Sequence, residues 1–384
     1  MSSEVLAPAS PEQVAEIMRH SARVGSIVVP RGAGTKLDWG RPPSTVDLPL
    51  DLSRLDTVLE HAAGDLVVRV EAGVRLADLT KVLGPAGQRL AIDEVVPGST
   101  IGGVISTGLS GPSRLLYGAV RDLLIGITVV RADGAVTHSG GKVVKNVAGY
   151  DLGKLYTGAF GTLGVITEAI FRLHPLPERT AWVSATLADE ASAGTAVAAV
   201  LESQVVPSAV EVARDEPAGP VTVTVLLEGV APGVEARAAA VTALLGRDAT
   251  TADAPPPWWG TLPGPTIVKL TAEIAAVPRI LIAVREAAAA TALDVRVRGS
   301  AGVGVLYAGL ADDAAPESVH QLITALRSAC AAAGGGAVVL RAPLAIRAVV
   351  DMWGPVPGLA LMRRLKDQFD PGHRLSPGRF VGGI

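Results

Sequence analysis

Apolar and polar positions along the first 178 residues alternate between helical and strand-like spacing. Apolar residues at helical spacing follow Ser10, a candidate N-cap residue, and Pro11, which suits the first position of a helix. β-Branched runs bounded by turn residues predict strands, and two such runs flank Ala132-Asp133-Gly134, which predicts a hairpin. The predicted elements are helices over residues 10–25 and 75–87, strands over 26–29, 44–50 and 65–73, and a hairpin over 123–141.

A Pro-rich exit at Pro175 and Pro177 precedes a change of pattern. Beyond it, strand-like and helical runs alternate, and the succession repeats after a Pro-rich stretch that contains Trp258 and Trp259. This pattern predicts split β-α-β units in which helices lie on one face of a sheet. The predicted helices cover residues 190–203, 233–246, 278–291, 317–334 and 358–371, and the strands cover 181–188, 208–213, 221–229, 293–299, 302–310 and 337–343.

The chain has 384 residues, and this length favours two or three domains. We expect an α+β protein with a first domain over residues 1–178, an α/β domain with an antiparallel sheet over 179–350, and a C-terminal segment over 351–384 that packs back on the first domain.

Composition excludes several classes of function. A formal charge of −3 and an aromatic content of 3% argue against a nucleic-acid-binding surface. Cys330 is the single cysteine, which excludes an intramolecular disulfide and an all-cysteine iron–sulfur or zinc site. The N-terminus has no signal-peptide pattern, and no run reaches the roughly 18 to 20 apolar residues of a membrane span. We expect a cytoplasmic chain, and association with a membrane through partners stays open.

Glycine is concentrated in three short segments of the first domain. The first glycine loop, Pro30–Lys36, follows a strand, and the second and third loops cover Pro97–Gly103 and Gly158–Gly164. Glycine lets the backbone approach a ligand closely, and consecutive backbone N–H groups bind anions. The first loop alone is more typical of an ordinary glycine-rich surface turn. Three such loops, however, indicate one long ligand, for which a nucleotide cofactor with a diphosphate is suitable.

The order of the motifs carries a resemblance to a known family. "PRGAGTK", "VPGSTIGGVISTGLSG", "YGAVRDLLIGITVVRADG", "GAFGTLGVITEAIFRLHP" and "LKDQFDPGHRLSPGRF" follow one another as in the vanillyl-alcohol oxidase-type, or PCMH-type, FAD-binding flavoproteins. The resemblance covers about residues 10 to 178 and the C-terminal tail. Within that family the chain is similar to the FAD-binding subunits of bacterial glycolate oxidase complexes.

The resemblance implies a PCMH-type FAD-binding domain of two subdomains, a cap domain, and an oxidoreductase that works with a second flavoprotein subunit and an iron–sulfur subunit. It also implies which residues contact FAD. They are Pro30, Arg31, Gly32, Ala33, Gly34, Thr35, Lys36, Pro97, Gly98, Ser99, Thr100, Ile101, Gly102, Gly103, Ser106, Thr107, Gly108, Gly118, Asp122, Gly161, Gly164 and Ile166.

Two departures from the family pattern matter. The tail reads Ser376-Pro377-Gly378 where relatives have Asn-Pro-Gly, which weakens or rebuilds a polar contact near the flavin. Members that bind FAD covalently use a histidine or cysteine near the first two glycine loops, and this chain has neither there. We therefore expect FAD to be bound noncovalently.

The chemistry beyond FAD is less defined. None of the six histidines pairs at metal-ligand spacing, so we expect no metal, and His373 is the histidine expected nearest the flavin. No general base for oxidation of a 2-hydroxy acid is evident. Arg114, Arg341 and Arg347 are candidates for binding a carboxylate, although a structural role is the more common one for arginine. The catalytic residues stay unknown.

Three interpretations of function stay open. The first is a flavin subunit of a multi-subunit glycolate oxidase that passes electrons to an iron–sulfur partner, for which the missing metal motif and base argue. The second is a stand-alone FAD-dependent dehydrogenase or oxidase of another alcohol or 2-hydroxy acid. The third is an assembly scaffold with little flavin chemistry, against which the intact glycine loops argue.

Overall fold

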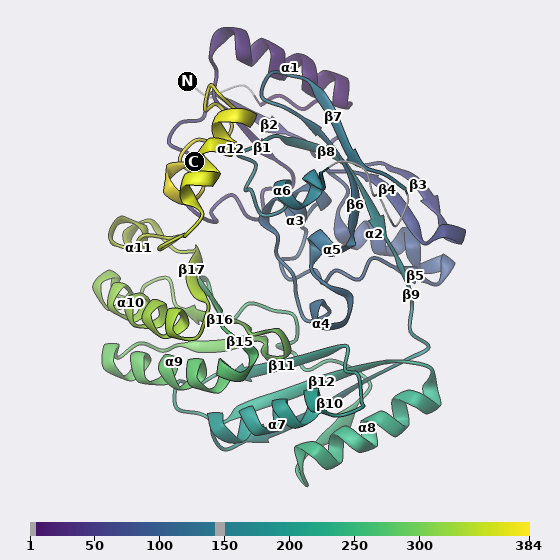
Figure 1. Ribbon diagram of the computed structural model, residues 1–384, viewed down its shortest axis with the longest axis vertical. Coiled ribbons are helices and arrows are strands. Elements are labelled where there is room, and N and C mark those ends of the chain that lie inside the picture. The colour runs from purple at the N-terminus through teal and green to yellow at the C-terminus, as the bar shows by residue number, and fades with distance from the viewer. Residues whose placement is uncertain (1–4, 143–149) are drawn as a thin grey trace. The chain divides into compact units, whose positions relative to one another are not determined.

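The computed structural model describes residues 5–142 and 150–384. The chain forms two compact units (Figure 1). The first unit comprises residues 1–110, 118–176 and 355–384, and the second comprises 111–117 and 177–354. The unit boundaries near 176 and 354 lie close to the expected ones at 178 and 350. Residues 111–117, which we expected in the first domain, pack with the second unit instead.

The first unit is built around two sheets of different size. The smaller sheet is a parallel pair of β1 and β2. The larger sheet is antiparallel, and its strand order is β3-β4-β8-β6-β7. A short pair, β5 with β9, completes the strands. The strands are β1 (Val28–Arg31), β2 (Leu48–Asp51), β3 (Val58–Ala62), β4 (Val67–Glu71), β5 (Gln88–Arg89), β6 (Leu124–Val130), β7 (Val136–Gly140), β8 (Val165–Arg172) and β9 (His174–Pro175).

The helices of the first unit are short apart from its first and last ones. The hydroxyl of Ser10 accepts a 3.3 Å hydrogen bond from the N–H of Gln13, so the predicted N-cap of α1 is confirmed. The predicted hairpin is confirmed as β6 and β7, and Gly134 takes a φ of +82° in its turn. The helices are α1 (Pro11–Val24), α2 (Leu76–Leu83), α3 (Ile101–Thr107), α5 (Val120–Leu123), α6 (Leu152–Tyr156) and α12 (Leu359–Phe369).

The C-terminal segment packs into the core of the first unit. Leu375 pairs with Val28 at the start of β1, and it is buried in a cluster with residues of α1 and β2. Lys366 and Asp370, both fully buried, form an ion pair of 2.8 Å. The ammonium of Lys366 also donates to the carbonyl oxygens of Thr162 and Leu375, at 2.8 Å and 2.9 Å. These contacts join the tail to the third glycine loop.

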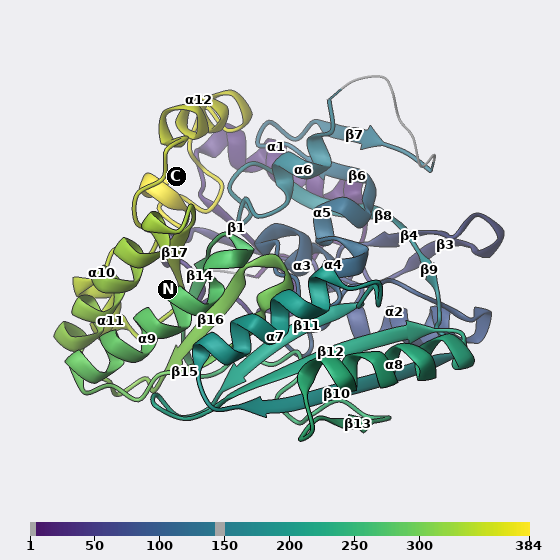
Figure 2. The same cartoon turned by 60° about the horizontal axis from the view of Figure 1, so that its bottom comes forward.

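The second unit is one antiparallel sheet of eight strands with helices along one face (Figure 2). The strand order is β13-β10-β12-β11-β15-β16-β14-β17. The strands are β10 (Arg179–Leu187), β11 (Ala209–Arg214), β12 (Val221–Gly229), β13 (Thr250–Ala252), β14 (Thr266–Thr271), β15 (Arg296–Ser300), β16 (Val305–Leu310) and β17 (Gly336–Arg341). The helices are α4 (Arg114–Tyr117), α7 (Glu190–Glu202), α8 (Ala231–Leu245), α9 (Val277–Thr291), α10 (Pro316–Ala332) and α11 (Leu344–Val349).

The sheet order reveals an internal repeat. β10-α7-β11-β12-α8-β13 and β14-α9-β15-β16-α10-β17 are each a split β-α-β motif, and β11 pairs antiparallel with β15 to join them. The edge of Trp182 packs against Trp259, with ring centroids 6.4 Å apart, and Trp258 lies beside Trp259. The two consecutive tryptophans thus form an aromatic cluster with Trp182, which lies on β10. None of the helices in the described part is long and apolar enough to cross a bilayer.

Candidate functional site

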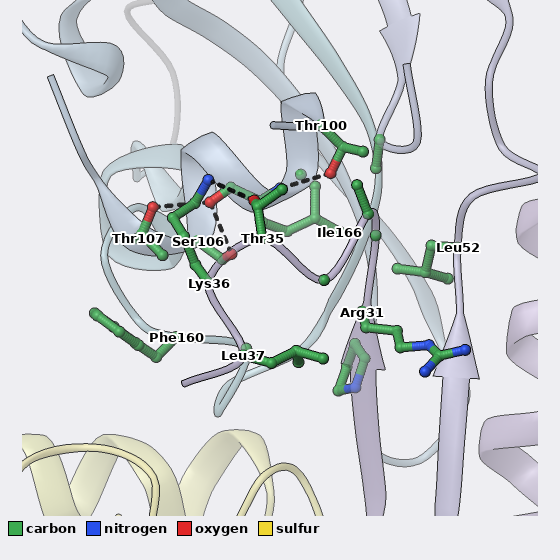
Figure 3. Close-up of a pocket in the computed structure, with 18 of the residues that line it drawn as sticks. Arg31, Thr35, Lys36, Leu37, Leu52, Thr100, Ser106, Thr107, Phe160 and Ile166 are labelled. Carbon is green, nitrogen blue, oxygen red and sulfur yellow. Dashed lines mark hydrogen bonds between the residues drawn. The ribbon is translucent and has the colours of Figure 1, made fainter. Parts of the chain in front are cut away.

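A pocket in the first unit collects most of the residues that the resemblance implies. Its empty space is about 710 Å³ including the open side, within the roughly 300–1,000 Å³ that is usual for small-molecule sites. The expected residues that line it are Pro30, Arg31, Gly32, Ala33, Gly34, Thr35, Lys36, Thr100, Gly102, Gly103, Ser106, Thr107, Gly161, Gly164 and Ile166. Figure 3 shows the labelled members of this set converging from β1, α3 and β8.

The first glycine loop supplies unpaired backbone donors. Among the described residues, no hydrogen-bond acceptor meets the N–H groups of residues 32 to 36, although they line the pocket. Gly34 has a φ of +75°, which favours glycine. A Cβ on Gly32 would lie 2.3 Å from Oγ1 of Thr100, so this position requires glycine. The loop is therefore a concave row of N–H groups, which suits an anion.

The second glycine loop contributes in a different way. The N–H groups of Ile101 and Gly102 donate to the carbonyls of Val74 and Ala72, at 2.9 Å and 2.8 Å. The N–H of Gly103 is capped by the hydroxyl of Thr100 at 3.3 Å. The first turn of α3 thus has its donors occupied by the protein. This segment lines the pocket with the hydroxyl-bearing residues Thr100, Ser106 and Thr107 and with close-packed glycines (Figure 3).

Lys36 is a buried cation of the site. Only 6% of its surface is exposed. Its ammonium donates to the hydroxyls of Ser99 and Thr35, at 2.5 Å and 3.2 Å. Burial lowers the pKa of Lys36 to about 8, and the charge of Glu94 opposes this shift. Within the described part of the chain, hydroxyls are the hydrogen-bond partners found for this buried ammonium, and such an environment favours a nearby anion.

The tail brings a second cation that sequence reasoning missed. Arg379 lines the pocket and donates a 2.8 Å hydrogen bond to the carbonyl of Lys36. Its guanidinium carbon lies 5.9 Å from the ring centroid of Phe160, close enough for a cation–π interaction. Burial lowers the pKa of Arg379 to about 10. Its Nε is buried and has no partner among the described residues.

Phe160 is a further lining residue outside the expected set. It adopts a φ of +54°, which is uncommon for a residue other than glycine. Its ring stacks on Phe380, with centroids 5.7 Å apart. The sequence indicates this role of Phe160 only weakly, because an aromatic residue inside a glycine loop is usually interpreted as a residue that packs in the core. The other lining residues outside the expected set are Leu37, Leu52 and Ala72.

Seven expected residues do not line the pocket: Pro97, Gly98, Ser99, Ile101, Gly108, Gly118 and Asp122. Several have local structural roles. Ser99 holds Lys36, and Gly108 ends α3 with a φ of +61°. The carboxylate of Asp122 accepts a 2.8 Å hydrogen bond from the N–H of Ala119, and a Cβ on Gly118 would lie 2.8 Å from that of Asp122. These two residues form the turn into α5.

The tail motif Ser376-Pro377-Gly378 lies beside the third glycine loop. The Ser376 side chain is fully buried, and its hydroxyl has no partner among the described residues. A Cβ on Gly161 would lie 3.9 Å from this hydroxyl. Ser376 has a φ of +44°, a conformation that asparagine tolerates better than serine does. His373 does not line the pocket; its Nε2 pairs with exposed Asp367 at 2.9 Å.

The residues present fit an FAD diphosphate. The five N–H groups of residues 32 to 36 and the cations Lys36 and Arg379 complement its negative charge. The glycines of all three loops admit a ligand against bare backbone, and Ile166, Leu52 and Phe160 supply apolar surface. Within residues 5–142 and 150–384, no three His, Cys, Asp or Glu side chains gather as metal ligands would.

Comparison with known proteins agrees with this geometry. Residues 3–140 match the model of the FAD binding domain, and residues 345–380 match the C-terminal domain of FAD linked oxidases. The fold of alkyldihydroxyacetonephosphate synthase superposes with a TM-score of 0.73 over 98% of this chain and 76% of that one, at 17% identity.

Three curated relatives illustrate the sequence similarity. Glycolate oxidase subunit GlcD of Bacillus subtilis is 34% identical over 55% of this chain and 45% of its own length. Glycolate oxidase subunit GlcE of Escherichia coli is 34% identical over 47% of this chain and 50% of its own. A D-lactate dehydrogenase of Archaeoglobus fulgidus is 34% identical over 44% and 38%. The chain thus spans about half the length of these relatives, or less.

The pocket, the two matching domain models and the shared fold lead to one assignment. The cofactor of the first unit is FAD. The C-terminal segment that supplies Arg379 and Ser376 falls within the second matching model. The two matching models identify an FAD binding domain and the C-terminal domain of FAD linked oxidases in this chain, which is similar to FAD-linked oxidoreductases with a PCMH-type FAD-binding domain.

Proposed function

We propose that this chain is the FAD-binding subunit of a cytoplasmic glycolate oxidase complex, a 2-hydroxy-acid dehydrogenase that converts glycolate to glyoxylate. Glycolate loses two electrons and two protons in this reaction. A second flavoprotein subunit and an iron–sulfur subunit complete the route of the electrons. The similarity to GlcD and GlcE supports the proposal.

The observation that carries the proposal is the row of N–H groups from residue 32 to residue 36, with Lys36 and Arg379 beside it. These groups would hold the diphosphate of FAD, and Phe160 and Ile166 would pack on its apolar parts. The chemistry that FAD supplies when bound is hydride acceptance and release of single electrons. The chain's own residues bind and orient the cofactor and supply the electrostatic environment that tunes it.

The sequence supports a subunit more than a complete enzyme. None of its six histidines pairs at metal-ligand spacing. Among the described residues that line the pocket, none is a carboxylate or histidine that could take the hydroxyl proton of a substrate. Its single cysteine leaves a cysteine-ligated cluster to a partner.

A dye-reduction assay tests the proposal. The chain with FAD bound, assayed alone, should reduce the dye with glycolate at least about a hundredfold more slowly than the co-expressed complex with the second flavoprotein and the iron–sulfur subunit. Equal turnover by the lone chain would overturn the subunit assignment. A complex that fails to assemble around this chain would do the same.

The second candidate is a stand-alone FAD-dependent dehydrogenase of another 2-hydroxy acid. This candidate is favoured by similarity to D-lactate dehydrogenases, such as those of Archaeoglobus fulgidus and Arabidopsis thaliana. In the same assay it predicts fast dye reduction by the lone chain with D-lactate. Assays of the lone chain and of the complex, each with glycolate and with D-lactate, therefore distinguish the subunit from the stand-alone dehydrogenase.

A further inference from the structure

A second hollow of the first unit borders the third glycine loop, and we call it the apolar hollow. Its empty space is about 510 Å³ including the open side. The residues that line it are Leu155, Thr157, Gly158, Ala159, Thr162, Leu163, Met362, Leu365, Phe380 and Ile384. Among the described residues, this lining and that of the FAD pocket have no member in common, so the two spaces are distinct.

The chemistry of the apolar hollow suits an uncharged molecule. Among the described residues that line it, none has a charged side chain. The hydroxyls of Thr157 and Thr162 already donate hydrogen bonds to the carbonyls of Gly153 and Ala159, at 2.8 Å and 2.7 Å. A charged ligand would lose its hydration there and gain no charge-assisted bond from the lining side chains in exchange.

The walls of the apolar hollow are held in place by contacts beside it. The ring of Tyr156 on α6 packs edge-on against that of Phe369 on α12, with centroids 5.9 Å apart. The ammonium of Lys366 on α12 donates to the carbonyl of Thr162 in the third glycine loop at 2.8 Å. Because α6, the loop and α12 are fixed in this way, the side chains around the hollow cannot collapse to fill it. Dry apolar cavities of about 150 Å³ lined by Leu, Ile and Phe bind benzene-sized rings.

A pair of stacked rings joins the apolar hollow to the FAD pocket. Phe380 lines the hollow and Phe160 lines the FAD pocket, and their rings stack at an interplanar angle of 25° with centroids 5.7 Å apart. The φ of +54° at Phe160 shows that its surroundings hold this residue in an uncommon backbone conformation. A molecule that contacts Phe380 in the hollow therefore acts on the ring pair that also borders the cofactor.

We propose that the apolar hollow is a second ligand site of the first unit, for an uncharged aromatic molecule, and that its occupancy is coupled to FAD binding through Phe380 and Phe160. The ring of the ligand would lie against Phe380 and supply the packing contacts that the empty space denies to Leu365 and Met362. A ligand that steadies the stacked pair also steadies the wall of the FAD pocket, so each of the two ligands favours binding of the other. The site does not depend on which substrate the protein oxidises.

Calorimetry on the full chain with FAD bound tests the site, with toluene as the probe. The wild type should bind toluene, and benzoate, a charged ring of similar size, should bind at least about tenfold more weakly. Leu365→Gln should weaken toluene binding at least about tenfold because it places an amide in the apolar lining. The matched control is Leu361→Gln on the same helix; Leu361 is 55% exposed and lies outside the lining, so the affinity should not change.

A variant that fills the apolar hollow tests the site even where the polar variant is unstable. Met362→Trp adds a larger ring at a half-buried position of the lining, so it should abolish toluene binding. Its melting temperature and its FAD content should stay at or above those of the wild type, because it fills empty space. No toluene binding by the wild type, or wild-type affinity in Leu365→Gln and Met362→Trp, would overturn the site.

Fluorescence titration of the FAD-free protein tests the coupling. Saturating toluene should strengthen FAD binding about fivefold, and FAD should strengthen toluene binding by the same factor. Competition of toluene for the FAD pocket would weaken FAD binding instead. In Phe380→Leu, which removes one ring of the stack, the effect of toluene on FAD affinity should disappear. FAD affinity that toluene leaves unchanged or weakens in the wild type, or an enhancement that survives in Phe380→Leu, would overturn the coupling.

Discussion

The ammonium of Lys36 donates a hydrogen bond of 2.5 Å to the hydroxyl of Ser99 and thereby joins the first glycine loop to the second. Burial holds the pKa of this ammonium at about 8, and a bound diphosphate raises it because a nearby anion favours the charged form. FAD affinity should therefore be full below pH 8 and fall by up to about tenfold per pH unit above it. Fluorescence titration of FAD between pH 6.5 and 9.5 measures this dependence.

The Lys36→Met variant separates this charge from the rest of the pocket. It should bind FAD about 10 to 100 times more weakly below pH 8, in line with roughly 1.5–3 kcal/mol for a charged hydrogen bond, and its affinity should not change as pH rises through 8. Lys81→Met, which removes an exposed lysine paired with Asp78, is the control and should behave as the wild type does. A pH dependence that survives in Lys36→Met would assign the titration to another group.

The glycine at position 32 is required by its contact with Thr100. In Gly32→Ala the new Cβ would meet Oγ1 of Thr100 at 2.3 Å, so the loop or the cap of α3 must shift. The purified variant should lose at least about nine-tenths of its FAD while its circular dichroism stays close to that of the wild type. Gly64→Ala is the matched control, since no atom lies within 4 Å of its Cβ, and it should keep its flavin.

The mode of FAD attachment can be read from a precipitation experiment. The lining of the pocket in the described part contains neither histidine nor cysteine, and these are the residue types that we expected a covalent bond to need. Acid precipitation should leave the yellow flavin in the supernatant. Flavin that stays with the denatured pellet after washing would be evidence for a covalent bond.

The buried pair of Lys366 and Asp370 should control the stability of the first unit. Lys366→Met leaves a buried carboxylate without its cation and removes the hydrogen bonds to Thr162 and Leu375, so we expect a loss of about 3–5 kcal/mol in the free energy of unfolding. Urea denaturation measures it.

The control for this pair is again Lys81→Met, whose exposed ion pair should be worth less than about 1 kcal/mol. The double variant Lys366→Met, Asp370→Asn should recover part of the lost stability because it removes the unpaired charge. Equal losses from the buried and the exposed lysine would show that the tail docks by apolar packing alone.

Local features of this protein could be predicted from the sequence because neighbouring residues determine them. Ser10 and Pro11 indicate the start of α1, and Asp133-Gly134 indicates the β6–β7 hairpin. The glycines of the first loop indicate a backbone open to a ligand, and the structure brings that loop into the pocket. Each of these signals acts over a few residues, through a cap, a turn or a backbone conformation.

The remaining features depend on contacts between residues far apart in the chain. Arg379 reaches the carbonyl of Lys36 across 343 positions, and no spacing rule links the two. The segment 111–117 packs with the second unit, where the side chain of Leu115 lies next to Gly302, and no local pattern in the sequence indicates this contact. Pairing of β11 with β15, which joins two repeated motifs into one sheet, likewise follows from matching hydrogen-bonding edges. The sequence by itself determined the glycine loop that lines the pocket and the cation Lys36 within it, whereas only packing decided that Arg379 stands beside them.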